Sequence, residues 1–276
     1  MDIRFAQIED FLKPPIPCIK ISILETKGST PRNIDAFMLV NEKQIIGTIG
    51  GGNLEFLAIK AAKKMLATGE VEQELEISLG IKTAQCCGGW VKIKLQILDE
   101  NHRTQLLQKT KIQEKNLPEI YLFGAGHVGK ALANLLAFMP FKTFLIDTRK
   151  DIVFDSPITI KTIITPLPET IIKQAKANSA FVVFTHDHAL DFLIMAEVLK
   201  RNHASYAGMI GSKTKCKKFA NWLLKNGGNE KQLAKITCPI GQPHTNAQTN
   251  AQAGDKRPNI IAALTLSEII SNIGVD

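Results

Sequence analysis

The alternation of hydrophobic and polar positions in the first third of the chain predicts a small sheet with one long helix. Three segments in which the two kinds of residue alternate predict half-buried strands: 18–24, 71–77 and 90–98. Residues 36–47 have the pattern of a hairpin, and residues 53–68 have that of a helix that Gly69 ends. We therefore predict a small N-terminal α+β domain over residues 1–100.

After Pro118 the pattern changes to short apolar segments that are separated by helical ones. The apolar segments that predict strands are 119–123, 141–147, 161–165, 179–185 and 205–211. The nearly continuous apolar run at 179–185 is typical of a strand buried on both faces of a sheet. This alternation predicts an α/β fold, with a Rossmann-like, doubly wound parallel-sheet domain over residues 119–276. The polar residues 101–118 predict a linker helix.

The composition is that of a globular protein and favours an anionic ligand or partner. Of the 276 residues, 45% are hydrophobic and 22% are charged, which suits two domains of ordinary size. The formal net charge of +8 favours an anionic partner. Basic residues gather locally at Lys213–Lys218, without interleaved aromatic residues, so the sequence argues against nucleic-acid binding.

The cysteines and the N-terminal segment lead to expectations about the compartment. The five cysteines are an odd number with no CxxC pair and no disulfide framework, so we expect a reduced, cytoplasmic chain without a structural zinc site. The charged N-terminal segment argues against a signal peptide. Because no apolar run approaches the roughly 18 residues that a membrane span needs, we expect no membrane partner.

A glycine motif, GAGHVG, follows the first predicted strand of the second domain. Gly124, Gly126 and Gly129 leave room for a phosphate to approach the backbone and the start of the next helix. Asp147 ends the next strand, near the distance of about 20 residues at which an acidic side chain meets a ribose hydroxyl. These four residues are candidates for binding NAD(P) or another nucleotide. His127 is either part of that site or a solvent-facing spacer.

Polar residues also follow two later strands of this domain. THDHALD places His186, Asp187 and His188 just beyond a buried strand, where open α/β sheets bind ligands. The alternative is that Asp187 caps a helix between two ordinary histidines. GMIGSK places Ser212 and Lys213 in a turn with the composition of an anion site, and its alternative is an exposed helix start.

Two loops of the first domain carry further candidate residues. Arg32 lies in the loop GSTPRN, which glycine and proline stiffen. Gly50, Gly51 and Gly52 precede a predicted helix, and three successive glycines allow a bound anion to approach the backbone closely. Glu55 falls in the first turn of that helix, where the helix dipole alone favours a carboxylate.

A third loop, QCCGG, contains Cys86 and Cys87. Soft thiolate sulfur binds transition metals and carries sulfane sulfur, and glycine amides stabilise a neighbouring thiolate. A bridge between adjacent cysteines forms a strained ring, so a structural disulfide is disfavoured here. The alternative is that one cysteine is a small buried hydrophobe. Cys86 and Cys87 are therefore the candidate metal ligands of the chain.

The motifs of both domains occur in an order that resembles one protein family. The series GSTPR, GTIGGGNLE, QCCGG, FGAGHVG, THDHALD, GMIGSK and CPIG is similar to that of the XdhC/CoxI family, the xanthine dehydrogenase accessory proteins. It differs at Asn53, where one branch of the family has cysteine, and at Ile260, where the family usually has glutamate. The polar stretch 242–258 is also longer than in the family.

The resemblance implies a chaperone rather than a turnover enzyme. It implies binding of the molybdenum cofactor (molybdopterin), support of its sulfuration, and its insertion into a xanthine dehydrogenase-type molybdoenzyme. Cys86 and Cys87 would then contact molybdenum or receive sulfur, with Arg32 and Gly50–Gly52 lining the same region. The implied partners besides the client enzyme are a cysteine desulfurase and a second copy of the chain in a homodimer.

The residues leave two other functions open. An NAD(P)-dependent oxidoreductase would use GAGHVG with His186 or His188 as the acid–base group, and it has no need of QCCGG. A persulfide sulfur-transfer protein would use Cys86 or Cys87 without binding the pterin tightly.

Overall fold

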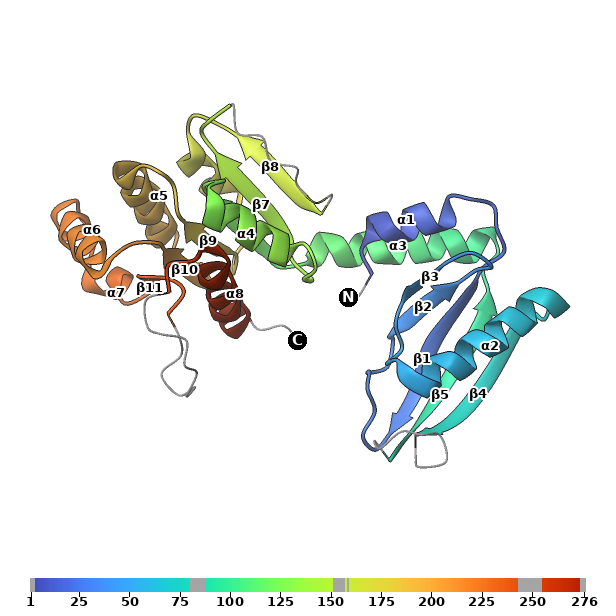
Figure 1. The fold of residues 1–276 in the computed structure, drawn as a ribbon. Coiled ribbons are helices and arrows are strands. Elements are labelled where there is room, and N and C mark those ends of the chain that lie inside the picture. The colour runs from blue at the N-terminus through green and yellow to red at the C-terminus, as the bar shows by residue number, and fades with distance from the viewer. Residues whose placement is uncertain (1–2, 80–87, 151–156, 158, 243–254, 274–276) are drawn as a thin grey trace. The chain divides into compact units, whose positions relative to one another are not determined.

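A computed structural model describes residues 3–79, 88–150, 157, 159–242 and 255–273. The chain forms two compact units, Met1–Asn116 and Leu117–Asp276, which are drawn in Figure 1 and are described here one at a time. No helix within the described ranges is long and apolar enough to cross a membrane.

The first unit is built on a five-stranded antiparallel sheet in the order β3-β2-β1-β5-β4. Its strands are β1 (Ile19–Lys27), β2 (Phe37–Val40), β3 (Ile45–Gly47), β4 (Glu72–Leu79) and β5 (Gly89–Ile97). Burial alternates along the first part of β1 and along most of β5, which confirms the predicted half-buried strands. The predicted hairpin is also confirmed, with Leu39 of β2 opposite Ile46 of β3.

Helices cover both faces of this sheet. α2 (Gly52–Thr68) lies across one face (Figure 1) and buries a single stripe of side chains there: Leu54, Ala58, Ala62 and Met65. Val40 of β2 joins this cluster, whereas its neighbour Leu39 packs with α1 (Phe5–Leu12) and α3 (Glu100–Asn116). Because successive side chains of a strand point to opposite faces, α1 and α3 lie on the other face.

The helix that the sequence predicts as a linker over 101–118 instead packs within the first unit. Its Leu106 lies in a buried cluster with Phe11, and the Arg103 guanidinium donates to the carbonyl oxygen of Leu12 at 3.2 Å. Only Leu106 and Thr110 are buried among the described residues of α3. So narrow an apolar stripe does not reveal in the sequence that this helix packs against a neighbour.

The second unit contains a six-stranded parallel sheet in the order β11-β10-β9-β6-β7-β8. Its strands are β6 (Glu119–Phe123), β7 (Lys142–Asp147), β8 (Ile160–Ile164), β9 (Ala180–Val183), β10 (Tyr206–Met209) and β11 (Ile236–Thr237). The chain builds outward in one direction from β6 to β8 and then in the other from β9 to β11. This strand order confirms the Rossmann-like fold class.

Helices cover both faces of the parallel sheet. They are α4 (His127–Leu136), η2 (Pro168–Gln174, a 3-10 helix), α5 (His188–Arg201), α6 (Lys213–Lys225), α7 (Glu230–Leu233) and α8 (Pro258–Ile273). α4 and α8 pack on the face that carries Ile120 and Leu122 of β6. α5 and α6 pack on the face that carries Tyr121 and Phe123. The sheet is thus buried on both sides, as its continuous apolar strands predict.

Two features at one edge of this sheet differ from the sequence-based expectations. β11 has only two residues, so it is too short to show an apolar pattern. Cys216 and Cys238 form a disulfide, so the expectation of fully reduced cysteines is wrong for this pair. They are separated by 22 residues and meet because α6 follows β10 and Cys238 follows β11, an adjacency that sequence spacing does not reveal.

Candidate functional site

The glycine motif after β6 forms a tight turn against the end of β9. Gly124 has a φ of 119°, and a Cβ there would lie 2.6 Å from the carbonyl oxygen of Phe184. A Cβ on Gly129 would lie 1.9 Å from the carbonyl oxygen of Gly124. Both positions therefore require glycine. Gly126 faces open space at the start of α4, and His127 is exposed, as expected of a spacer.

The Asp147 carboxylate at the end of β7 is bound from two directions within the unit. Its Oδ2 accepts from the Ala125 amide at 2.7 Å and from the Arg149 guanidinium at 2.9 Å, and its Oδ1 accepts from the Arg149 amide at 2.9 Å. Burial acts to raise the pKa of Asp147, but the hydrogen bonds from Arg149 and Ala125 outweigh it and lower the pKa to about 2. A ribose hydroxyl would have to displace Arg149.

A small cavity lies where β6, β7 and β9 end. Its lining includes Gly124, Asp147, Thr185 and His186. The structure thus brings the glycine motif, the acidic end of β7 and the first histidine of THDHALD together at the point where the strand order reverses. Open α/β sheets bind ligands at this point. His186 and His188 are both exposed.

Two predicted site residues cap helices. Asp187 caps α5 by accepting the backbone amide of Ala189 at 2.8 Å. Ser212 caps α6 by accepting the backbone amide of Lys215 at 3.2 Å, while Lys213 is exposed. For Asp187 and Ser212, the structure shows the local capping role that the sequence left as the alternative.

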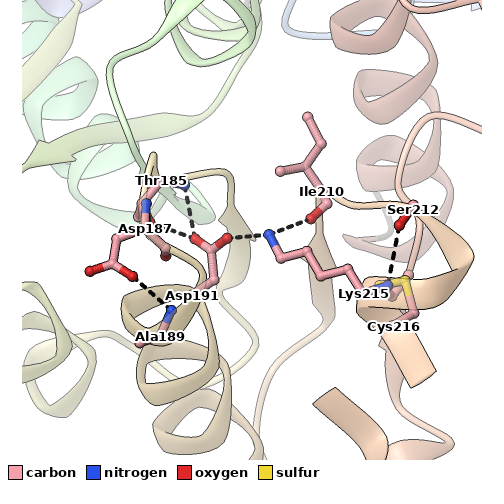
Figure 2. Close-up of polar contacts among 9 residues, drawn as sticks. Thr185, Asp187, Ala189, Asp191, Ile210, Ser212, Lys215 and Cys216 are labelled. Atoms are coloured by element: carbon pink, nitrogen blue, oxygen red, sulfur yellow. Dashed lines mark hydrogen bonds and ion pairs between the residues drawn. A yellow bond between two sulfur atoms is a disulfide. The ribbon is translucent and has the colours of Figure 1, made fainter. Parts of the chain in front are cut away.

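A polar network joins the loops that follow β9 and β10 (Figure 2). Asp191 of α5 is fully buried, and its Oδ1 accepts from the amide and the hydroxyl of Thr185 at 2.9 and 2.7 Å. Its Oδ2 pairs with Lys215 of α6, whose ammonium also donates to the Ile210 carbonyl at 2.9 Å. Sequence reasoning missed this pair. The sequence does contain a signal for it, because α5 and α6 each carry one charged residue on an otherwise apolar face. A charge buried on such a face requires a partner.

The three candidate loops of the first unit meet at one end of its sheet. A Cβ on Gly50 would lie 2.3 Å from Cγ of Pro31, so the triple-glycine loop touches the loop that carries Arg32. Ser29 of that same loop pairs with Gly88 through an isolated parallel β-bridge. A Cβ on Gly89 would lie 2.1 Å from the Ser29 carbonyl oxygen. The motifs GSTPR, GTIGGG and the last glycines of QCCGG are therefore neighbours.

The triple-glycine loop binds a carboxylate of its own chain. Oε1 of Glu55 accepts from the backbone amides of Ile49 and Gly51 at 2.9 and 2.8 Å, from that of Gly50 at 3.2 Å, and from the Thr48 hydroxyl. Burial acts to raise the pKa of Glu55, but these hydrogen bonds together lower it below its ordinary value. The sequence predicts that the glycine amides of this loop bind an anion, and in the structure the amides of Gly50 and Gly51 donate to Glu55.

The positive φ angles of Gly50, Gly51 and Gly52 (128°, 76° and 59°) explain why three glycines occur in a row. Side-chain-bearing residues rarely adopt this backbone region, and the amides turn toward Glu55 because of it.

Cys86 and Cys87 lie outside the described residues, whereas the next two residues of the motif are described. Gly88 and Gly89 line a surface cavity together with Lys27, Gly28, Ser78, Leu79 and Trp90. The Lys27 ammonium lies 4.9 Å from the centroid of the Trp90 ring. In the described part of the chain, no three His, Cys, Asp or Glu side chains gather as a metal site.

Comparison with known proteins identifies both units. Residues 120–269 match the model of the XdhC Rossmann domain, and residues 12–76 match that of the XdhC and CoxI family. The Uncharacterized protein YqeB of Escherichia coli (strain K12) is 23% identical over 270 residues, which are 92% of this chain and 43% of that protein. The chain thus spans less than half of the length of this relative.

The fold is similar to that of a solved structure. It is described as a xanthine dehydrogenase from Bacillus halodurans, with a TM-score of 0.75 and 16% identity over 98% of this chain and 95% of that chain. The likeness concerns the fold alone. The family models together account for the two units and their order, and the chain therefore belongs to the XdhC/CoxI family.

Proposed function

We propose that this chain is an accessory protein of a xanthine dehydrogenase-type molybdoenzyme, and that it binds the molybdenum cofactor and supports its sulfuration and insertion. The observation that carries the proposal is the meeting of GSTPR, GTIGGG and the glycines of QCCGG at one end of the first unit's sheet. Membership of the XdhC/CoxI family supports the accessory role.

The residues at this end fit an anionic cofactor by charge. Lys27 and Gly88 line the same surface cavity, and a Cβ on Gly88 would meet open space. The Arg32 side chain lies beside the triple-glycine loop, with its Cγ 3.7 Å from a Cβ built on Gly50. Because Glu55 already uses the Gly50 amide, we assign the binding of negative charge to Lys27 and Arg32.

Soft sulfur ligands would complete the site. When bound, the cofactor would supply a phosphate, a pterin and a molybdenum centre for which thiolates are suitable ligands. Cys86 and Cys87 directly precede Gly88, which pairs with Ser29. We therefore propose one of these two thiols as the metal contact or sulfur acceptor, with a cysteine desulfurase as the source of sulfur.

Retention of the cofactor tests this proposal. Anaerobic incubation of the protein with molybdenum cofactor, followed by gel filtration, should leave near-stoichiometric molybdenum and pterin on the wild type. We expect Cys86→Ala or Cys87→Ala to lower retention about tenfold, and Arg32→Gln to weaken it by removing a charge. Cys18→Ala is the matched control, because Cys18 is buried in the cluster of α1 and α3. No retention by folded wild type would contradict the proposal.

An NAD(P)-dependent oxidoreductase is the second candidate, favoured by the cavity that Gly124, Asp147 and His186 line. The occupation of Asp147 by Arg149 counts against it. Titration with NAD and NADP decides: micromolar binding by a protein that retains no pterin would favour the oxidoreductase.

Persulfide trapped on Cys86 or Cys87 without pterin retention would favour a sulfur-transfer protein. The homodimer and the cytoplasmic location stay predictions from the sequence and the resemblance.

A further inference from the structure

The Cys216–Cys238 disulfide lies at the carboxyl edge of the second unit's sheet, beside the network of Figure 2. Cys216 is in the first turns of α6, one residue after Lys215, and Cys238 directly follows β11. Both cysteines are half-buried, whereas Cys18 is buried in the core of the first unit. The bond links the helix that follows β10 to the turn that follows β11.

One of the two cysteines lies in a basic segment at the start of a helix. Cys216 lies near the N-terminus of α6, where backbone amides favour a negative charge. Lys213, Lys217 and Lys218 are exposed on the same helix within three residues of it. Cys238 follows a two-residue strand and precedes Pro239, so it is not part of a helix and meets the start of α6 only through the disulfide. The surroundings therefore stabilise a thiolate at Cys216 more than at Cys238.

We propose that Cys216 and Cys238 form a redox-active pair that exchanges its disulfide with a dithiol reductant. A thiolate of the reductant attacks Sγ of Cys238, the bond between Cys216 and Cys238 breaks, and Cys216 leaves as the thiolate. The second thiolate of the reductant then attacks the reductant's other sulfur, which is bonded to Cys238 in the mixed disulfide. This closes the disulfide of the reductant and releases Cys238 as a thiolate. Two electrons pass from the dithiol to the cysteine pair, the reductant becomes a disulfide, and its protons pass to the cysteines or to water.

Reduction has a structural consequence at the edge of the sheet. β11 pairs with β10 only through Ala207 opposite Ile236 and Gly208 opposite Thr237. Beyond it, the Ile240 amide donates to the Met209 carbonyl at 3.3 Å. With so few backbone contacts, the disulfide and the packing of the buried Ile240 are the links that hold residues 236–240 to the rest of the unit. The reduced state should therefore open more readily there, whether or not the first unit binds the cofactor.

A redox titration of the folded, full-length protein tests the pair. The protein is equilibrated in glutathione buffers and in dithiothreitol buffers of graded ratio, quenched with acid, and labelled with a maleimide that shifts its mass. We expect half-reduction of Cys216 and Cys238 within the glutathione range, with unchanged circular dichroism. A pair that stays oxidised until the protein unfolds, or that never oxidises, would overturn the proposal.

The direction of attack is tested with single cysteines. In a background with Cys18→Ser, Cys86→Ser and Cys87→Ser, Cys238→Ser leaves Cys216 as the single cysteine and Cys216→Ser leaves Cys238. Modification by a chromogenic disulfide at neutral pH should be about tenfold faster for the protein that keeps Cys216. Lys217→Gln with Lys218→Gln should slow Cys216 severalfold and leave Cys238 unchanged. Equal rates would overturn the assignment of Cys216 as the leaving thiolate.

Hydrogen–deuterium exchange tests the consequence. Reduction should raise exchange in residues 236–240 at least threefold while β6, in the centre of the sheet, is unchanged. The variant with Cys216→Ala and Cys238→Ala should exchange at the faster rate with or without reductant, which separates loss of the bond from any effect of the reagent. Identical exchange in oxidised, reduced and variant proteins would contradict a role for the bond at this edge.

Discussion

Glu55 and Asp147 each place a carboxylate against backbone amides of a glycine loop. Glu55 accepts amides of the triple-glycine loop, and Asp147 accepts the Ala125 amide inside GAGHVG. In both cases a fixed charge of the chain occupies backbone donors that glycine-rich loops commonly offer to phosphates. The residue types were informative about anion binding, but the anion in the structure is a side chain.

Asp147 should make the second unit sensitive to acid. Its pKa in the folded protein is about 2, below the ordinary value of 3.8, so its contribution is fully present above about pH 4 and is lost as pH falls toward 2. We expect up to about 2 kcal/mol of unfolding free energy to disappear over this window, measured by urea denaturation at graded pH. Asp147→Asn should flatten that pH dependence, whereas Asp187→Asn, at an exposed cap, should preserve it.

Glu55→Gln should destabilise the first unit by about 2 kcal/mol, because hydrogen bonds to a charged acceptor are replaced by weaker ones to an amide. Because the pKa of Glu55 is lowered, its contribution to the free energy of unfolding is present above its ordinary pKa and is lost in acid. The stability of the variant should therefore match that of the wild type at low pH. Thermal unfolding at pH 7 and in acid measures this. Glu70→Gln, at an exposed position just after α2, is the control and should change little.

At the scale of elements, contacts between helices organise the carboxyl edge of the parallel sheet. α5 and α6 are joined by the ion pair of Asp191 and Lys215, and Asp191 in turn holds Thr185, which lines the cavity at the ends of β6, β7 and β9. This arrangement couples the loop after β9 to the loop after β10 through one buried carboxylate.

Lys215→Met should destabilise the second unit by about 3–5 kcal/mol, because it leaves the Asp191 charge buried without its partner. The variant that combines Asp191→Leu with Lys215→Met should recover much of that loss, since no charge then remains unpaired. Urea denaturation of the wild type, the single variants Asp191→Leu and Lys215→Met, and the double variant forms a double-mutant cycle. A double variant no more stable than Lys215→Met would show that the loss of the Thr185 contacts outweighs the removal of the unpaired charge.

At the scale of the whole molecule, each unit has its own hydrophobic core. Among the described residues, two clusters lie within the first unit and two within the second. The second unit divides its core between the two faces of the sheet, with Leu122 on one side and Phe123 on the other. The units therefore satisfy their own burial requirements, as domains of this size do.

Because each core is complete, fragments 1–116 and 117–276 should fold separately. We expect each to unfold cooperatively in urea with a midpoint close to one transition of the intact chain. A first fragment cut at residue 99 should be markedly less stable, because it lacks α3 and with it Leu106 and the Arg103 contact to Leu12. Equal stability of the two first fragments would show that α3 serves as the linker the sequence predicts.

The sequence by itself determined the fold class, the positions of most strands along the chain and the family, because periodic burial and ordered motifs are local properties of the chain. It also placed Arg32, Gly50 and the QCCGG glycines on loops that the structure brings together.

Only the tertiary structure decided which distant groups pair with one another. Asp191 with Lys215, Cys216 with Cys238, and α3 with α1 are contacts between segments that are far apart in the sequence. Each depends on which strands are neighbours in the sheet or which helix covers which face, and residue spacing along the chain carries no information about either. The same reason explains why the carboxylate of Glu55, and not a ligand, fills the donors of the triple-glycine loop: whether the side chain reaches them depends on how that loop turns back over the start of α2.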